Sequence, residues 1–138
     1  MAVVSDIICV STKGKRDIID ITSMIQELIT GNEVKDGIVT VFMPGSTAAL
    51  TTIEFEPGLI KDLDQFLENI LPYKVEYKHH NTWHDDNGAA HLQSALIGPS
   101  VTIPIVNGTL TLGTWQQVIL VDCDTRPRNR KIVVQILQ

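Results

Sequence analysis

The residues best able to do chemistry in this sequence are its histidines. All 4 of them lie within one short stretch, at positions 79, 80, 84 and 91. The same stretch contains the adjacent carboxylates Asp85 and Asp86, followed by Asn87. A neutral imidazole can ligate a metal or carry a proton near neutral pH, and a carboxylate can orient it. The spacing matches no standard zinc signature, so the stretch is either a functional cluster or a solvated loop.

A second group of chemically versatile side chains is the run from Gly113 to Gln117, which reads Gly-Thr-Trp-Gln-Gln. Gly113 permits close approach of a ligand, Trp115 offers a stacking face and Gln116 offers an amide with both donor and acceptor atoms. One interpretation is a binding pocket, and the other is a β-bulge with Trp115 in the core. Glu54, near the end of an uncharged strand pattern, is either a solvent-facing edge residue or a buried base.

Two further segments could recognise an anion. Ser100 follows Gly98-Pro99, where its hydroxyl and backbone N–H could contact phosphate, although the same pattern also ends helices. Three arginines alternate at positions 126, 128 and 130, and guanidinium groups match phosphate geometry. The alternative for these arginines is an exposed hairpin tip.

The composition narrows the class of protein. The net charge is -5 and the isoelectric point is about 5.2, which argues against a nucleic-acid-binding surface. No apolar run approaches the roughly 20 residues needed to span a bilayer, and no signal peptide is recognisable, so we expect a cytoplasmic protein without membrane contact. Cys9 and Cys123 lie in apolar runs and are expected to be buried thiols, or a disulfide if their strands are neighbours. The mean hydropathy of +0.11 leaves room for a buried subunit interface.

Hydrophobic periodicity predicts a single α+β domain over residues 1–138, with a mostly antiparallel sheet core and two or three helices. Apolar residues at helical spacing predict helices over 21–31 and from Pro57 to before Pro72, with Asp20 as the cap of the first. A short third helix is expected to start at Asp86 or Asn87. The expected strands are 3–10, 37–43, 46–56, 74–79, 101–105, 110–112, 117–124 and 131–137.

Several of these motifs together resemble the YjbQ family, which is described as secondary thiamine-phosphate synthase. The resemblance covers nearly the whole chain. The matching residues are His79, Asn87 with His91, Leu96 to Ser100, Gly108 to Leu110, and Leu112 to Gln117. The resemblance implies a small trimeric α+β domain with pockets near subunit contacts. It also implies a weak activity that joins hydroxymethylpyrimidine diphosphate, a small phosphate substrate, to thiazole phosphate.

Glu54, His79 and His91 match positions of the family. For the implied reaction we expect a divalent metal, zinc or magnesium, held by His79, His91 and His84, with Asp86 or Glu54 orienting an imidazole or completing the metal ligands. The expected catalytic group is Glu54, Asp86, His91 and Gln116. The expected substrate-binding group is Asn87, Ser100, Thr114, Trp115, Arg128 and Arg130. The alternative function is a trimeric protein that binds a metal or a small anion without strong catalysis.

One position departs from the family pattern. Many relatives carry His-Thr-Thr or His-Thr-Ser where this chain has Gly45-Ser46-Thr47. If that imidazole acts in the relatives, this chain must use another group, and His84 is the nearest spare candidate.

Overall fold

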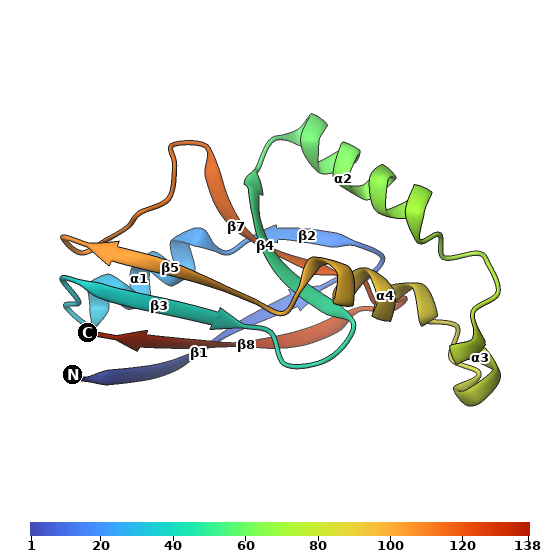
Figure 1. Ribbon diagram of the computed structural model, residues 1–138, viewed down its shortest axis with the longest axis horizontal. Helices are drawn as coiled ribbons and strands as arrows, with labels where there is room; N and C mark the ends of the chain where they lie inside the picture. The colour runs from blue at the N-terminus through green and yellow to red at the C-terminus, as the bar shows by residue number, and fades with distance from the viewer.

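The chain folds into two antiparallel sheets with four helices around them, as described over residues 1–138 by a computed structural model (Figure 1). The strands are β1 (Val3–Thr12), β2 (Asp17–Asp20), β3 (Gly37–Phe42), β4 (Ala48–Glu54), β5 (Ser100–Val106), β6 (Thr109–Leu110), β7 (Gln116–Asp122) and β8 (Arg128–Leu137). The helices are α1 (Thr22–Gly31), α2 (Pro57–Ile70), α3 (Lys78–Trp83) and α4 (Gly88–Ile97). None of these helices has the length and continuous apolar character needed to span a bilayer.

The two sheets divide the strands unequally. The larger sheet has the order β1-β8-β3-β5-β6, and the smaller has the order β2-β7-β4. Every strand pair is antiparallel, which confirms the expected α+β class. The chain passes between the sheets at every connection except that from β5 to β6. The crossings from β1 to β2 and from β7 to β8 occur at the same end of the molecule, because β1 ends beside the start of β8 and β2 begins beside the end of β7.

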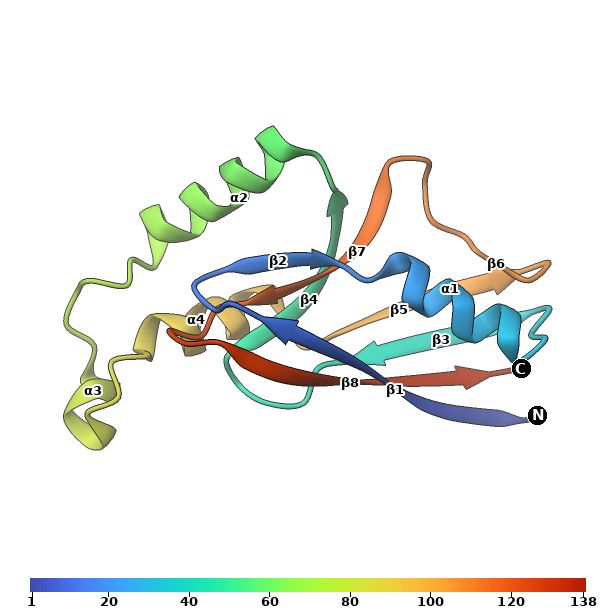
Figure 2. The same ribbon diagram turned by 180° about the vertical axis from the view of Figure 1, so that it is seen from behind.

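The main hydrophobic core lies between α1 and the two sheets. Ile21 and two residues of α1, Ile25 and Ile29, are fully buried there, which accounts for the helical spacing of apolar residues in this segment. Figure 2 shows α1 on the side of the molecule turned away from the viewer of Figure 1. A 19-residue cluster forms this core, so most of the buried apolar surface is on one side of the small sheet.

A second, smaller core lies under α2 and α4, on the other face of the small sheet. It contains Leu67 of α2, Ala90 of α4, and Ile119, Val121 and Cys123. Leu67 is the one buried residue of α2. This helix is therefore anchored by few apolar contacts, although its apolar stripe was evident in the sequence.

Several local expectations differ from the structure. The strand expected over 74–79 is absent, since residues 74–77 form no strand and α3 begins at Lys78. Tyr77 packs closely against Gly88, where an added Cβ would lie 2.7 Å from Tyr77 Cβ. The first helix starts at Thr22 with Ile21 as its cap, although Asp20 Oδ1 still accepts the Thr22 N–H over 2.9 Å. The short strand β2 was not expected, and the helices number four rather than two or three.

The two cysteines differ from the expectation that both are buried. Cys9 is exposed, because the alternation of β1 turns Ile8 and Val10 into the core and Cys9 outward. Cys123 is buried, and burial raises the pKa of its thiol to about 12. Both are free thiols, and β1 pairs with β8 rather than with the strand preceding Cys123.

The turn between β1 and β2 has an unusual backbone. Gly14, Lys15 and Arg16 have successive positive φ angles of 79°, 52° and 64°. Non-glycine residues in this left-handed region cost roughly 1–2 kcal/mol each. The turn is held by backbone hydrogen bonds from the Lys15 N–H to the Asp124 carbonyl and from the Arg16 N–H to the Asp122 carbonyl. These bonds fix the turn against the β7–β8 connection.

The Gly14→Ala substitution should therefore destabilise the protein by about 1–3 kcal/mol, because it adds strain at positive φ. Its Cβ would also lie 2.5 Å from the Arg126 carbonyl oxygen. Gly31→Ala is the matched control, since a Cβ there meets nothing within 4 Å and the residue has no positive φ. Urea unfolding of both variants measures the difference. Equal stabilities of the two variants would contradict the strained-turn interpretation.

Candidate functional site

The histidine-rich stretch forms α3, the loop that follows it and the start of α4. His79 on α3 and His91 on α4 have their ring centroids 4.7 Å apart, at an interplanar angle of 65°. The two rings therefore converge, as predicted for a shared site. His79 is about two-thirds buried, with 33 % of its side chain exposed, so a small molecule can reach the pair from solvent.

Two polar side chains surround the His79 ring. His79 Nε2 lies 3.5 Å from Asp85 Oδ1. With its amide nitrogen turned toward this group, Asn87 donates to His79 Nε2 over 3.1 Å and to Asp85 Oδ1 over 2.9 Å. Asn87 therefore supports the neutral ring, whereas Asp85 supports the protonated ring. A histidine with a partner for each protonation state is suited to proton transfer.

The expectation that Asp86 orients an imidazole is wrong, because Asp85 is the carboxylate beside His79. Asp86 instead lines a separate hollow with Lys15 and Arg16. Asp85 and Asp86 are adjacent in the sequence, and the conformation of the loop places Asp85 beside His79. Asp86 has a positive φ of 54°, which no pattern in the sequence signals.

His84 does not join His79 and His91. Its ring lies against His80, with the centroids 5.6 Å apart. His80 and His84 are four residues apart on the α3 turn, so they share one face, while His79 points elsewhere. No group of three or more His, Cys, Asp or Glu side chains is arranged to hold a metal ion. The predicted three-histidine metal site does not fit the donors that a single chain brings together.

The second predicted group lies where β4 ends and β7 begins. Glu54 and Gln116 are opposite each other in the register of these strands. Gln116 Oε1 accepts the Gly113 N–H and its Nε2 donates to Thr52 Oγ1, each over 3.0 Å. The Gln116 amide therefore closes the loop that precedes β7.

Trp115 is 72 % exposed in this loop, so the alternative of a bulge with Trp115 in the core is wrong. Trp115 and Thr114 line an open cleft of about 410 Å³ together with three carboxylate residues, Asp20, Glu54 and Glu56. Glu56 caps α2 by accepting the N–H groups of its first turn, and these hydrogen bonds lower the pKa of the Glu56 carboxyl. Glu54 is exposed and forms no ion pair in the chain.

The two groups lie at opposite ends of β4. Its first residue, Ala48, accepts a 2.7 Å hydrogen bond from Ser94 of α4, and its last residue, Glu54, precedes α2. Figure 1 shows β4 running from α4 at one end toward α2 at the other. Seven strand residues span roughly 20 Å. Glu54 and Gln116 therefore do not share one site with His91 in the same chain.

The Gly98-Pro99-Ser100 segment has a structural role in the fold. The Gly98 carbonyl accepts the Leu50 N–H over 3.0 Å, and the Pro99 carbonyl accepts the Met43 N–H over 2.8 Å. These bonds tie α4 to β3 and β4. Ser100 is exposed at the start of β5, opposite Phe42, and forms no side-chain hydrogen bond.

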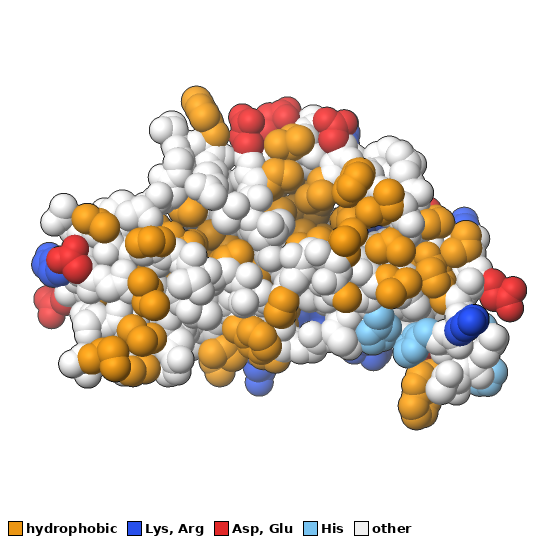
Figure 3. All heavy atoms as spheres, in the orientation of Figure 1, with side chains coloured by type: hydrophobic (Ala, Val, Ile, Leu, Met, Phe, Trp, Pro, Cys, Tyr) orange, Lys and Arg blue, Asp and Glu red, His pale blue; other side chains and the backbone are white.

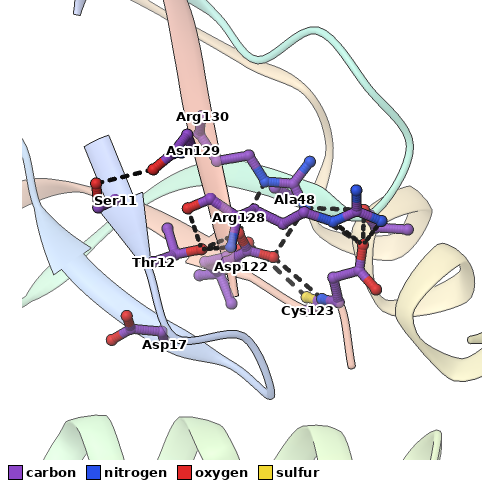
Figure 4. A network of polar contacts seen from close by, with 12 residues as sticks. Ser11, Thr12, Asp17, Ala48, Asp122, Cys123, Arg128, Asn129 and Arg130 are labelled. Carbon is purple, nitrogen blue, oxygen red and sulfur yellow. Dashed lines mark hydrogen bonds and ion pairs between the residues drawn. The ribbon is translucent and has the colours of Figure 1, made fainter. Parts of the chain in front are cut away.

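The arginines predicted to bind an anion are instead tied to buried aspartates (Figure 4). Arg130 donates from Nε and Nη2 to the two carboxylate oxygens of Asp122, each over 2.8 Å. Arg128 donates from Nε to Asp124 Oδ2 over 2.7 Å. Asp122 and Asp124 are 0 % and 1 % exposed, so both charges depend on these partners. Arg126, the third arginine of the segment, is exposed.

Hydroxyl groups complete this network. Thr12 Oγ1 donates to Asp122 Oδ2, and Thr47 Oγ1 donates to Asp124 Oδ2 over 3.1 Å. The hydrogen bond to Asp122 raises the pKa of Arg130, against the effect of burial. Burial acts to raise the pKa of Asp124, but hydrogen bonds from Thr125, Arg128 and Thr47 lower it overall.

Gly45, where the family resemblance leads us to expect a histidine, lies next to this network. A Cβ added at Gly45 would be 3.6 Å from Arg130 Nη1, and nothing else lies within 4 Å of it. The space above Arg130 is therefore open in this chain.

Comparisons with known proteins define the class. A family model described as "UPF0047 protein YjbQ-like" matches residues 6–138. A UPF0047 protein of Archaeoglobus fulgidus is 40% identical over 126 residues, covering 91% of this chain and 95% of its own. A UPF0047 protein of Mycobacterium tuberculosis is 34% identical, covering 97% and 98%. The chain belongs to the YjbQ (UPF0047) family.

Solved structures agree with this assignment. A YbjQ-like protein of unknown function from Sulfolobus solfataricus superimposes with a TM-score of 0.91 at 34% identity, covering 98% of this chain and 96% of its own. An uncharacterized conserved protein of the same family from Clostridium acetobutylicum gives 0.87 at 34% identity, covering 96% and 99%. The fold is thus shared, and the activity has to be argued from the side chains.

Asp124 provides a test of the buried network. Asp124→Asn should lower the free energy of unfolding by about 3 kcal/mol at neutral pH, because it leaves Arg128 without its charged partner. Since the folded pKa of Asp124 is depressed, its contribution is complete above the unfolded pKa of about 3.9 and is lost as pH falls through the folded value. The variant should therefore lose less stability than the wild type on acidification below about pH 4.

Asp62→Asn is the control, since Asp62 is exposed on α2 and contacts no partner. Thermal melts from neutral to acidic pH measure both variants. If the stability of Asp124→Asn falls as steeply on acidification as that of the wild type, the network does not depend on this charge.

Proposed function

We propose that this protein is an enzyme that uses the His79–His91 pair to transfer a proton during a reaction on a small phosphorylated molecule. The observation that carries the proposal is the pair itself: two imidazoles 4.7 Å apart, one of them between a carboxylate and an amide. The reaction to test first is the weak joining of hydroxymethylpyrimidine diphosphate to thiazole phosphate, which the family resemblance implies.

The chemistry of that reaction suits a proton donor. The thiazole nitrogen attacks the methylene carbon of the pyrimidine, a C–N bond forms, and the C–O bond to the diphosphate breaks. The departing oxygen gains negative charge, which a nearby imidazolium stabilises by donating a proton. Asp85 stabilises the charged form of His79 before the transfer, and Asn87 hydrogen-bonds the neutral form after it.

The second candidate is binding of a metal or a small anion without strong catalysis. The observation that favours it is the close approach of the His79 and His91 rings, with Asp85 beside His79. A metal at this place would require a further ligand from outside the chain. Elemental analysis of the purified protein distinguishes this candidate from metal-free acid–base chemistry.

We further propose that the protein assembles as a homotrimer that completes the site between subunits. The Glu54 and Trp115 group is too far from His91 to act with it in one chain, and rotation about a symmetry axis can bring the two groups of neighbouring subunits together. Assembly is not needed to bury the small residues at the start of β4. Ala48, Ala49 and Leu50 are already buried within the chain.

The support for assembly is instead an exposed apolar surface. Figure 3 shows hydrophobic side chains gathered over α2, α4 and β4. The exposed large apolar residues of this region are Phe55, Phe66, Ile70, Leu92 and Leu96. A surface of this kind on a small protein indicates a contact with another molecule.

Turnover tests the catalytic proposal. His91→Ala should reduce joining of the two precursors by roughly 10²–10⁴-fold, the usual effect of losing a general acid or base. His84→Ala is the matched control, because it removes an imidazole from the same stretch that faces His80 instead. Equal losses in both variants would argue against the pair. Wild-type protein that binds the precursors without joining them would favour the second candidate.

Light scattering tests the assembly. Wild-type protein should have the mass of three chains at micromolar concentration, and Leu96→Asp should shift it toward one, because a carboxylate cannot be buried unpaired in an apolar contact. Val106→Asp, which changes an apolar residue of similar exposure at the far end of β5, should leave the mass unchanged. A monomeric wild-type protein would remove the shared-site proposal and leave the His79–His91 pair to act alone.

A further inference from the structure

A hollow beside the β1–β2 turn is distinct from the His79–His91 pair and from the cleft at Trp115, although Asp86 of the histidine-rich stretch lines it. It has a volume of about 480 Å³, within the range of sites for small molecules. Its lining residues come from the β1–β2 turn, the end of α2, the segment after α2, the loop before α4 and the β7–β8 connection: Lys15, Arg16, Glu68, Tyr73, Lys74, Asp86 and Thr125. Tyr73 is the one apolar body among them, so the hollow is built for a polar ligand.

Arg16 is the fixed element of this hollow. Its side chain is only 8% exposed, and its guanidinium lies 4.5 Å from the centre of the Tyr73 ring. Nε donates to Asp64 Oδ1 and Nη1 lies 3.0 Å from Glu68 Oε2, both on α2. Nη2 forms no hydrogen bond within the chain, so one donor of an otherwise immobilised guanidinium stays available.

The ionisation of Arg16 and Tyr73 is set by the same contacts. Burial is the largest single influence and acts to lower the pKa of Arg16, but the contacts with Asp64, Tyr73 and Glu68 together raise the pKa. Burial raises the pKa of Tyr73, whose hydroxyl donates to the Cys123 carbonyl over 2.7 Å. The positively charged guanidinium of Arg16 therefore lies against the neutral ring of Tyr73.

Two more cations reach the hollow without partners. Lys15 and Lys74 line it, both are exposed, and neither forms an ion pair. The strained turn that places Lys15 and Arg16 is held by its surroundings at an energetic cost, which is typical of functional positions. The Thr125 hydroxyl adds a neutral donor.

The carboxylates of the hollow define the other end of the ligand. Glu68 is occupied by Arg16, whereas Asp86 has no cationic partner. An unpaired carboxylate repels a phosphate but accepts a hydrogen bond from an amine or a hydroxyl. Asp86 directly follows Asp85, which contacts His79, so the hollow and the histidine pair lie on either side of one short loop.

We infer that this hollow binds a small phosphorylated molecule, with its phosphate on Lys15, Lys74 and Arg16 Nη2 and a hydrogen-bond donor of the same molecule on Asp86. The inference gives the proposed function a site for the phosphate of its substrate. It depends on that function for the identity of the molecule and not for the presence of the site.

Calorimetric titration with inorganic pyrophosphate tests the cationic end. We expect binding to the wild type at millimolar concentration or below, weaker in high salt. The double variant Lys15→Gln/Lys74→Gln should bind about tenfold more weakly or worse, because it loses two charge-assisted contacts. Lys131→Gln, an exposed lysine on β8 outside the hollow, should bind as the wild type does. No binding by the wild type, or equal binding by all three proteins, would overturn the inference.

Hydroxymethylpyrimidine diphosphate, which carries a ring amine, tests the Asp86 end. Asp86→Asn should weaken binding of this molecule and leave pyrophosphate binding unchanged or tighter, since the substitution removes a negative charge. Equal weakening for both ligands would overturn the assignment of Asp86.

The same titrations separate this inference from the proposed function. His91→Ala should keep pyrophosphate binding while turnover is lost. Pyrophosphate binding that depends on Lys15 and Lys74 in a protein without turnover would support the hollow and reject the reaction. Turnover that is unaffected in the double lysine variant would support the reaction and reject the hollow as the phosphate site.

Discussion

The buried ion pairs between the end of β7 and the start of β8 are the interaction on which the rest of the structure depends. Asp122 and Asp124 are inaccessible to water, so their charges require the guanidinium groups of Arg128 and Arg130. Thr12 of β1 and Thr47 of the β3–β4 connection bond to the same carboxylates. The backbone of this segment also accepts the N–H groups of the β1–β2 turn. Three parts of the chain that are distant in sequence, residues 12–16, Thr47 and residues 122–130, are thereby fixed where the two sheets separate.

This arrangement explains how the His79–His91 pair is held in position. The network holds the β3–β4 connection, the first strand residue of β4 holds α4 through Ser94, and α4 carries His91 beside His79. Breaking a buried pair is costly because it leaves a charge without a partner. The geometry of the histidines therefore rests on residues that do not touch them. Arg128 and Arg130 matter to the site as supports, which differs from the anion clamp that their alternation in the sequence indicates.

Helices and strands could be predicted from the sequence because they depend on repeated patterns. Site features that depend on single contacts could not. Helical spacing located α1 and α2, and alternation located most strands, because these signals are repeated over many residues. The convergence of His79 and His91 was also predicted. Three features each depend on the conformation of one loop: Asp85 rather than Asp86 lies beside His79, His84 lies apart from the pair, and Trp115 is exposed. Arg16 was missed altogether, because a lone arginine in a turn carries no pattern until α2 folds over it.

The weak attachment of α2 has a thermodynamic consequence. One buried leucine and the ionic bracket of Arg16 with Asp64 and Glu68 hold much of this helix to the sheet. Such an element opens locally at a lower free energy than the sheets beneath it. An anion bound at the free nitrogen of Arg16 would bind only when the helix is closed, so occupancy and closure are linked by mass action. The ligand would then act as part of the tertiary structure, and the protein would hold α2 most firmly when its substrate is abundant.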